Sequence, residues 1–185
     1  MAATEAVAVA FGIAYLVLAI RRHRACWIAG GASTAVFIAV YLEAGLPLQA
    51  ALQALYVVVA VYGWFTWRPG SGLPEQPRSW RLSLHGLALA GTALATAIST
   101  PILARYGASA APLAESLGTW TSLVATWLLA RRVVDSWIWW IVIDTGLAAL
   151  FASQGLRLTA LLYLAFAGLA VVGWRSWRRA MAAGA

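Results

Sequence analysis

The chain has 185 residues, of which 63% are hydrophobic and only 10% are charged. Soluble domains average about half apolar and a quarter charged residues, so this composition excludes a water-soluble domain and indicates a membrane protein. The net charge is +7, but the arginines that carry it stand at the ends of apolar segments, which indicates membrane topology and argues against a nucleic-acid surface.

Apolar segments separated by breaker residues predict an all-α membrane protein with seven transmembrane helices. The clearest break is the segment 68–74, which contains two prolines and two glycines. The first apolar segment is interpreted as a helix and not as a secretory signal peptide, because no basic residue precedes it. In chain order, the predicted helices cover residues 3–20, 25–42, 48–67, 82–103, 113–130, 134–152 and 157–175.

The distribution of arginine predicts the orientation of these helices. The first connection holds Arg21, Arg22 and Arg24, whereas the second holds only Glu43, and the alternation continues along the chain. Basic residues concentrate on the cytoplasmic side of a membrane. We therefore expect the N-terminus outside, the C-terminus in the cytoplasm, and a cytoplasmic tail over residues 179–185.

A shift of 110 residues aligns the chain with itself. Residues 5–68 and 115–178 share 18 identities in 64 aligned positions without a gap, and the matches include paired tryptophans, glycines and arginines. We predict two three-helix repeats, 1–68 and 111–178, joined by a loop and a linker helix in 69–110. The second repeat begins four helices after the first. Because four crossings return the chain to the same side of the membrane, both repeats have the same orientation. This is the 3+1+3 layout of parallel repeats known from transporters.

The sixth predicted helix carries an acidic residue, Asp144, near its middle. An ionisable group inside the bilayer costs about 2.5–3.5 kcal/mol on insertion scales and is a functional candidate by default. Trp137, Trp140 and Asp144 are spaced i, i+3 and i+7 and share one helical face. A carboxylate beside two indoles suits a flat aromatic cation. Alternatively, the tryptophans form an interfacial belt and Asp144 bonds a neighbouring hydroxyl.

Other candidates come from both predicted repeats. Gln53 and its repeat mate Tyr163 are expected to face one cavity from opposite sides, or else to join helices by hydrogen bonds. Further candidate substrate-binding residues are Ser33, Phe37, Tyr41 and Tyr62, and candidate gate residues, or belt anchors, are Trp64 and Trp174. No nucleophile–base pair, metal cluster or phosphate-binding loop is evident, so we expect neither an enzyme nor a cofactor or metal.

Several of these motifs together resemble a known family. The run Val61-Tyr62-Gly63-Trp64-Phe65-Thr66-Trp67, the run Trp137-Ile138-Trp139-Trp140-Ile141-Val142-Ile143-Asp144, the pair Gln154-Gly155 and Tyr163 carry the resemblance. They resemble the PnuC family of nicotinamide riboside transporters over nearly the whole chain. That family resembles the related SWEET sugar transporters in its 3+1+3 layout.

The resemblance implies facilitated uptake of a vitamin precursor by alternating access across a bacterial inner membrane. It also implies that a cytoplasmic vitamin kinase traps the substrate. Gln53, Trp137 and Trp140 match residues of the family's binding site, whereas Ser33, Ala60 and Asp144 stand where the family leads us to expect asparagine. The carboxylate favours a cation, so nicotinamide riboside comes first and thiamine second, with riboflavin or a deoxynucleoside as further alternatives.

Two other function classes stay open at this point. One is a membrane enzyme that acts on a lipid, which would need a catalytic constellation that Asp144 alone does not supply. The other is a sugar carrier of the broader superfamily. The expected partners are a small-molecule substrate and the lipid bilayer but no nucleic acid, and a homo-oligomer is left open.

Overall fold

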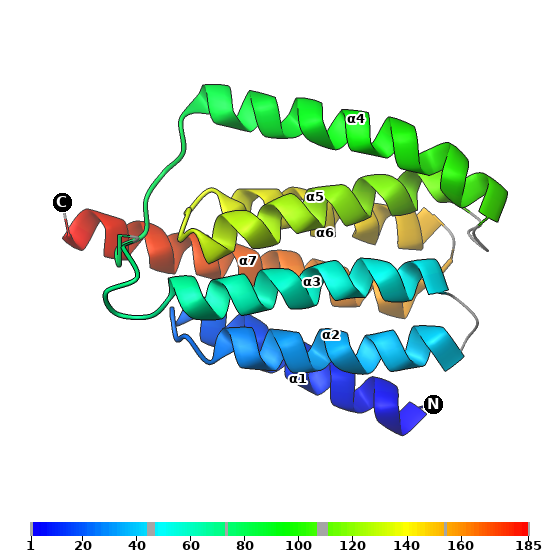
Figure 1. The fold of residues 1–185 in the computed structure, drawn as a ribbon, viewed down its shortest axis with the longest axis horizontal. Coiled ribbons are helices and arrows are strands. Elements are labelled where there is room, and N and C mark those ends of the chain that lie inside the picture. The colour runs from blue at the N-terminus through cyan, green and yellow to red at the C-terminus, as the bar shows by residue number, and fades with distance from the viewer. Residues whose placement is uncertain (1, 44–46, 73, 107–110, 154, 185) are drawn as a thin grey trace.

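The computed structural model describes residues 2–43, 47–72, 74–106, 111–153 and 155–184, which form seven α-helices (Figure 1). The helices are α1 (Ala2–Ile20), α2 (Cys26–Glu43), α3 (Pro47–Thr66), α4 (Leu82–Tyr106), α5 (Pro112–Ala130), α6 (Ser136–Ser153) and α7 (Arg157–Ala183). The all-α class and the order of the predicted helices agree with this structure. Gln154, one of the residues that carry the family resemblance, falls outside the described residues.

Two helices are longer than the sequence predicted. Helix α4 continues to Tyr106 with Pro101 inside it, and the hydroxyl of Thr100 donates to the carbonyl of Thr96 just ahead of that proline. Helix α7 continues to Ala183, so residues 179–183, predicted as a tail, are helical instead. The prediction ended each helix where its apolar stretch ends. Alanine, arginine and methionine also favour the helical conformation, so the helix continues beyond that point.

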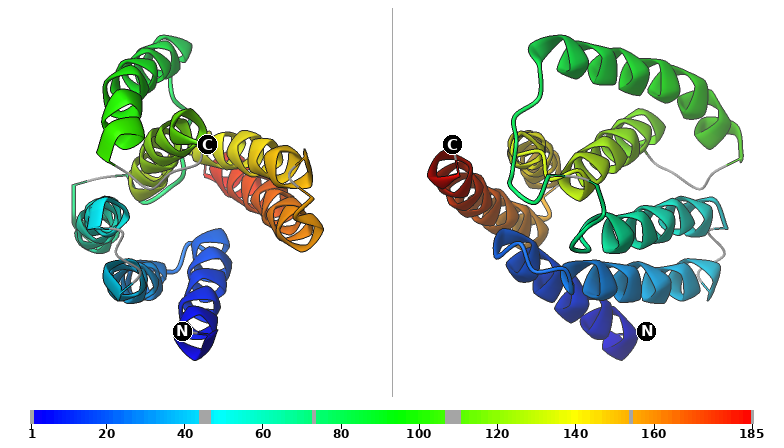
Figure 2. Two further views of the ribbon diagram at one scale, coloured as in Figure 1. Left: turned by 90° about the vertical axis from the view of Figure 1, so that its right-hand side faces the viewer. Right: turned by 60° about the vertical axis from the view of Figure 1, so that its left-hand side comes forward.

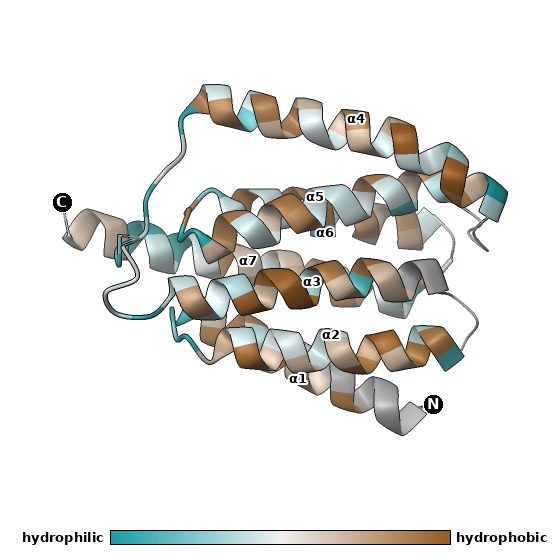
Figure 3. Cartoon of the chain, in the orientation of Figure 1, coloured by the Kyte–Doolittle hydropathy of each residue, from teal (hydrophilic) through white to brown (hydrophobic). Residues whose placement is uncertain are grey.

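The surface of the bundle is apolar. Four helices, α2, α4, α6 and α7, are long and apolar enough to cross a membrane, and α1, α3 and α5 contain 19, 20 and 19 residues alongside them. Leu87, Val142 and Val58 are exposed by 70%, 67% and 64%. Hydrophobic colour dominates the helices, and hydrophilic colour gathers in the connections near the C-terminus (Figure 3). Such a surface is suited to lipid.

The helices form two groups with α4 at the edge. Helices α1–α3 pack on one another in chain order, as do α5–α7, and we call each set of three helices a unit; α4 lies at the edge beside α5 (Figures 1 and 2). The units meet where α3 packs on α5 and α1 packs on α7. The chain ends lie at opposite ends of the bundle (Figure 1). This agrees with an odd number of crossings.

The turns that end α1 and α5 have matching geometry. Arg22 and Arg132, 110 residues apart, have φ angles of 58° and 56°, and they are the non-glycine residues with positive φ among those described. In both turns the arginine N–H donates three residues back and the following N–H donates five residues back. This is the Schellman motif, which ends a helix by donating hydrogen bonds to its last free carbonyl groups.

One end of the bundle carries Arg22, Arg68, Arg132 and Arg178, and we call it the arginine-rich end. A cluster of four tryptophans fills the core there. We call Trp27, Trp67, Trp137 and Trp177 the tryptophan cluster; each is at most 4% exposed. Ring centroids lie 5.5 Å apart for Trp27 and Trp67, and 5.6 Å apart for Trp137 and Trp177. Both pairs meet edge to face, the arrangement that aromatic quadrupoles favour. The rings of Trp67 and Trp177, with centroids 5.9 Å apart, join the two pairs, so the cluster connects the two units at this end.

Candidate functional site

A small cavity lies in the middle of the bundle, where both units meet. This central cavity has a volume of about 140 Å³. Its lining comes from α1, α2, α3, α5 and α6: Gly12, Tyr15, Trp27, Gly30, Ser33, Thr34, Tyr56, Ala60, Thr126 and Trp140. Trp27 also belongs to the tryptophan cluster, so the cluster adjoins this cavity on the arginine-rich side.

A second cavity lies nearer the opposite end of the bundle. This distal cavity has a volume of about 250 Å³. Its lining residues are Tyr41, Leu52, Gln53, Tyr56, Ala114, Glu115, Gly118, Thr119, Ser122 and Leu147. Tyr56 lines both cavities and stands between them. Pockets for small ligands typically measure roughly 300–1,000 Å³, a range that the two cavities reach together but neither reaches alone.

Helix α5 lines both cavities with a stripe of polar residues. Glu115, Thr119 and Ser122 face the distal cavity and Thr126 faces the central one. Their spacing of i, i+4, i+7 and i+11 keeps them on one side of the helix. Across from them, the hydroxyl of Tyr56 donates to the carbonyl of Thr119 over 3.4 Å and also bonds Ser122. A polar path therefore runs along α5.

Helix α6 contributes the acidic residue. Trp140 lines the central cavity and Leu147 lines the distal one, and Asp144 lies one turn from each on the same face. The side chain of Asp144 is only 6% exposed. Among the described residues it has no hydrogen-bond or ion-pair partner, and no arginine lines either cavity. A buried carboxylate in this setting attracts a cation.

The central cavity also holds buried polar atoms without protein partners. Tyr15 and Trp27 line it, and the hydroxyl of Tyr15 and the indole nitrogen of Trp27 are buried with no hydrogen-bond partner among the described residues. Buried polar groups are nearly always hydrogen-bonded to protein, water or a ligand. Two residues of the lining thus carry a buried donor that no described protein atom satisfies.

Four of the eleven predicted site residues line these cavities, namely Gln53, Tyr41, Ser33 and Trp140, and Asp144 lines neither. Gln53 hydrogen-bonds Tyr41 in the distal cavity, and Phe37 stacks on Tyr41 with ring centroids 6.0 Å apart. Tyr163 lies within electrostatic range of Asp144 and Tyr41. Ser33, 7% exposed, lines the central cavity with Trp140. The structure therefore brings residues from both units to one region.

Other predicted site residues lie apart from both cavities. Trp137 is fully buried in the tryptophan cluster, one turn beyond Trp140. Tyr62 lies near Arg68 at the arginine-rich end. The guanidinium carbon of Arg24 lies 3.4 Å from the ring centroid of Trp64, and Arg178 covers Trp174 at 5.2 Å. Trp64 and Trp174 thus occupy matching places at that end.

Sequence reasoning left several lining residues out of the predicted site. Tyr15, Tyr56, Thr126 and Glu115 were not among the predicted substrate-binding residues, although all four line a cavity. The polar spacing along α5 is the signal that could have identified two of them. Tyr15 carries no comparable pattern, because only the packing of α1 against α2 brings it to the cavity.

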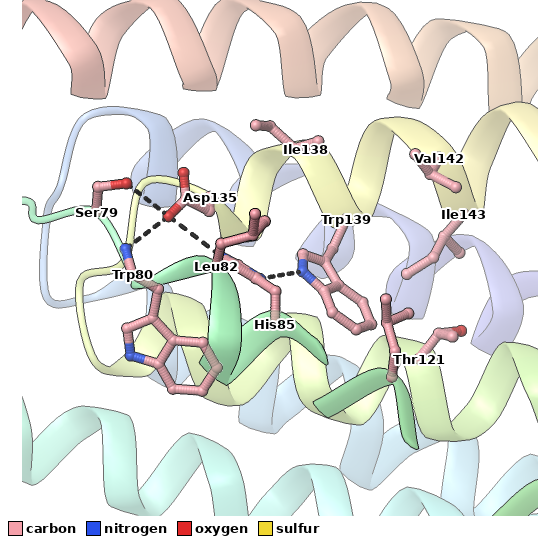
Figure 4. Close-up of a pocket in the computed structure, with 11 residues that line it drawn as sticks. Ser79, Trp80, Leu82, His85, Thr121, Asp135, Ile138, Trp139, Val142 and Ile143 are labelled. Atoms are coloured by element: carbon pink, nitrogen blue, oxygen red, sulfur yellow. Dashed lines mark hydrogen bonds and ion pairs between the residues drawn. The ribbon is translucent and has the colours of Figure 1, made fainter. Parts of the chain in front are cut away.

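A lateral cavity of about 460 Å³ lies between α4 and α6 and has a different character (Figure 4). The carboxylate of Asp135 accepts bonds from the Ser79 hydroxyl at 2.9 Å and the Trp80 N–H at 2.7 Å. The indole of Trp139 donates to Nδ1 of His85 over 3.2 Å, and Nε2 of His85 lies 3.4 Å from Asp135. These contacts join the start of α4 and the residues before it to the start of α6.

Comparison with solved structures identifies the fold. The crystal structure of the vitamin B3 transporter PnuC aligns with a TM-score of 0.75 and 21% identity, covering 98% of this chain and 83% of that chain. This similarity shows a shared fold.

Comparison with characterised proteins gives two further relatives. The nicotinamide riboside transporter PnuC of Escherichia coli (strain K12) is 23% identical over 200 residues, covering 94% of this chain and 84% of that protein. The riboflavin/roseoflavin transporter RibM of Streptomyces davaonensis is 24% identical over 137 residues, covering 70% of this chain and 63% of RibM. The family model described as nicotinamide mononucleotide transporter matches residues 2–179, so the chain belongs to this family of membrane transporters.

Proposed function

We propose that this protein takes up nicotinamide riboside, a pyridinium cation, through the central and distal cavities. The observation that carries the proposal is the place of Asp144. Its buried carboxylate lies on the face of α6 between Trp140 and Leu147, which line the two cavities, and none of the described arginines lines either one. The relatives support the same substrate, because the protein from Escherichia coli is named for it.

The chemistry of the lining fits the two halves of that substrate. The indole of Trp140 offers a face on which a pyridinium ring stacks, and the carboxylate balances the charge of the ring. Gln53, Tyr41 and Tyr56 offer polar groups for ribose hydroxyls in the distal cavity. A neutral apolar solute would leave the carboxylate and these groups without partners, at a cost in binding free energy.

Alternating access in this proposal relies on the two three-helix units as parallel repeats around a linker helix. The matching turns at Arg22 and Arg132 and the symmetric tryptophan pairs support this 3+1+3 architecture. All seven helices then cross the membrane, with the substrate path at the repeat interface near the midplane. The tryptophan cluster closes that path at the arginine-rich end.

The proposed orientation puts the arginine-rich end in the cytoplasm of a bacterial cell, with the N-terminus outside the inner membrane. Trp64 under Arg24 and Trp174 under Arg178 then stand at the cytoplasmic ends of α3 and α7, where they serve as gate residues. The distal cavity receives substrate from outside. Trapping by a cytoplasmic kinase, and not coupling to an ion, drives net uptake.

Thiamine is a second candidate substrate because the central cavity has few groups for a sugar. Ser33 and Ala60 both line this cavity, and neither carries an amide. Thiamine is also a flat cation but has no ribose. Riboflavin, for which one relative is named, is neutral and makes no use of the Asp144 charge.

Uptake into proteoliposomes tests the proposal, with labelled nicotinamide riboside and thiamine offered in parallel. Trp140→Ala is the test variant and Trp139→Ala is its matched control. The two tryptophans are neighbours on α6, but Trp139 faces the lateral cavity (Figure 4). We expect saturable uptake of nicotinamide riboside that Trp140→Ala abolishes and Trp139→Ala preserves.

The competing outcomes are distinct. Saturable uptake of thiamine alone would replace the substrate and keep the site. Uptake that both variants reduce equally would remove the central cavity from the transport path. Transport of neither compound by the wild-type protein would refute the proposed substrate class.

A further inference from the structure

We propose that Glu115 is a second substrate-selecting carboxylate, which captures the positively charged substrate in the distal cavity before it reaches Asp144. This inference rests on the proposed function, because it assigns a step in the uptake of a cation. No sequence motif of the predicted site includes Glu115. Its role follows from what surrounds it in the structure.

Glu115 stands at the entrance to the polar stripe of α5. It lies in the first turn of α5 and lines the distal cavity together with Gln53 and Tyr41. Below it on the same face, Thr119 and Ser122 line the same cavity, and Thr126 lines the central one. A solute that enters the distal cavity therefore meets the glutamate before it meets the deeper polar groups.

A chain of polar neighbours connects Glu115 to Asp144. The carboxylate of Glu115 acts electrostatically on the hydroxyl of Tyr41, and Tyr41 and Asp144 both act on the hydroxyl of Tyr163. Among the residues that the structure describes, no arginine lines these cavities. Two carboxylates at different depths, joined by hydroxyl groups, give a cation favourable positions along the whole path.

The surroundings strengthen the effect of this charge. Charges interact more strongly in a partly buried cleft than in water, and clefts lined by one sign of charge concentrate counter-ions. Glu43, by contrast, is exposed at the end of α2 on the same side of the bundle and lines neither cavity. It provides a carboxylate of the same kind outside the site, and hence a matched control.

A structural role for Glu115 makes a different prediction. A carboxylate in the first turn of a helix is stabilised by the helix dipole, so its loss lowers stability whichever substrate is offered. A selecting role, in contrast, separates substrates by charge. The 1,4-dihydro form of nicotinamide riboside has nearly the shape of the cation and carries no positive charge, so it distinguishes the two roles.

The experiment measures KM and kcat for both forms in proteoliposomes that contain the wild-type protein, Glu115→Gln, Glu115→Asp or Glu43→Gln. We expect Glu115→Gln to raise KM for the cation about tenfold and to leave KM for the dihydro form within about threefold of wild type. Glu115→Asp keeps the charge and should stay close to wild type. Glu43→Gln should stay close to wild type for both substrates.

Each alternative result overturns the inference in a recognisable way. Equal changes in KM for the two forms would assign Glu115 to the structure of α5. An equal effect of Glu43→Gln would assign the selection to surface potential. If the wild-type protein carries the cation and Glu115→Gln leaves its KM unchanged, the inference fails while the proposed function stands. If wild type carries neither form, both fail.

Discussion

Trp67 and Trp177 meet across the boundary between the two three-helix units, with ring centroids 5.9 Å apart and planes inclined by 50°. The indole N–H of Trp67 donates to the carbonyl of Ala130 at the end of α5, over 3.0 Å. The indole N–H of Trp177 donates to the carbonyl of Ala19 near the end of α1, over 3.1 Å. Each unit thus donates an indole hydrogen bond to a carbonyl near the end of the other unit's first helix.

Replacing either tryptophan with phenylalanine should destabilise the protein by a similar amount. Trp177→Phe or Trp67→Phe removes one buried hydrogen bond and part of the ring contact, at a cost of about 1–3 kcal/mol in the free energy of unfolding. Denaturation of the purified protein in detergent measures the loss. A large loss for one variant and none for the other would contradict the reciprocal role.

Replacing Gly173 should destabilise the protein, because the ring of Trp137 occupies the space beside it. A Cβ atom at Gly173 would lie 2.6 Å from a ring carbon of Trp137, whereas a Cβ atom at Gly168 on the same helix meets nothing within 4 Å. We expect Gly173→Ala to lower the free energy of unfolding by about 1–3 kcal/mol. Gly168→Ala is the control and should preserve or raise stability, because alanine favours the helix. Equal stability of the two variants would contradict this packing.

Arg22 and Arg132 both have a left-handed backbone conformation, but their replacement by glycine should have different effects on stability. Arg22 has an exposed side chain, so Arg22→Gly chiefly relieves its backbone, and we expect a gain in stability of up to about 1 kcal/mol. Arg132 donates from Nη1 to the carbonyl of Pro74 over 2.9 Å and lies over Trp67. Arg132→Gly should therefore lower the melting temperature. A gain for both variants would show that the contacts of Arg132 contribute little.

The helices were predictable because their signals are local. Apolar stretches and the breakers between them placed all seven helices in order, and the 110-residue match paired Arg22 with Arg132 before their shared left-handed conformation was visible. The end of α7 was missed because hydropathy reports the membrane and not the helix, which continues to Ala183.

The candidate site was less predictable because it depends on which helices meet. The helical period predicted one face of α6 for Trp137, Trp140 and Asp144, but only Trp140 lines the central cavity, and Trp137 lies in the tryptophan cluster. Tyr62 was chosen for its aromatic ring alone. It lies six residues after Tyr56, which separates the two side chains by about 120° around α3 at 3.6 residues per turn, and it lines neither cavity.

The orientation of the bundle in the membrane can be determined by labelling single introduced cysteines in a Cys26→Ala background. Ser153 is exposed near the end of α6 and Ser71 is exposed in the loop after α3, at opposite ends of the bundle. A membrane-impermeant maleimide should label Ser153→Cys on intact cells and Ser71→Cys only after lysis. The reverse pattern would invert the proposed topology. A reporter protein fused after Ala185 should likewise indicate a cytoplasmic location.

The charge of Asp144 can be removed with little change in shape. Asp144→Asn keeps the size of the side chain and a carbonyl acceptor, so its effect isolates the charge of this buried residue. We expect kcat/KM for nicotinamide riboside to fall by at least about tenfold, with the uncharged dihydro form within about threefold of wild type. The same uptake assay in proteoliposomes measures both values.

The depth of Asp144 separates its effect from that of Glu115. A carboxylate that only captures substrate at the entrance changes KM, whereas one that balances the cation in the occluded site also changes kcat, because the charge has to be carried through the membrane. Asp144→Asn should therefore lower kcat for the cation. Equal losses for the charged and uncharged forms would remove the charge argument and leave Asp144 a role in packing α6 against α7.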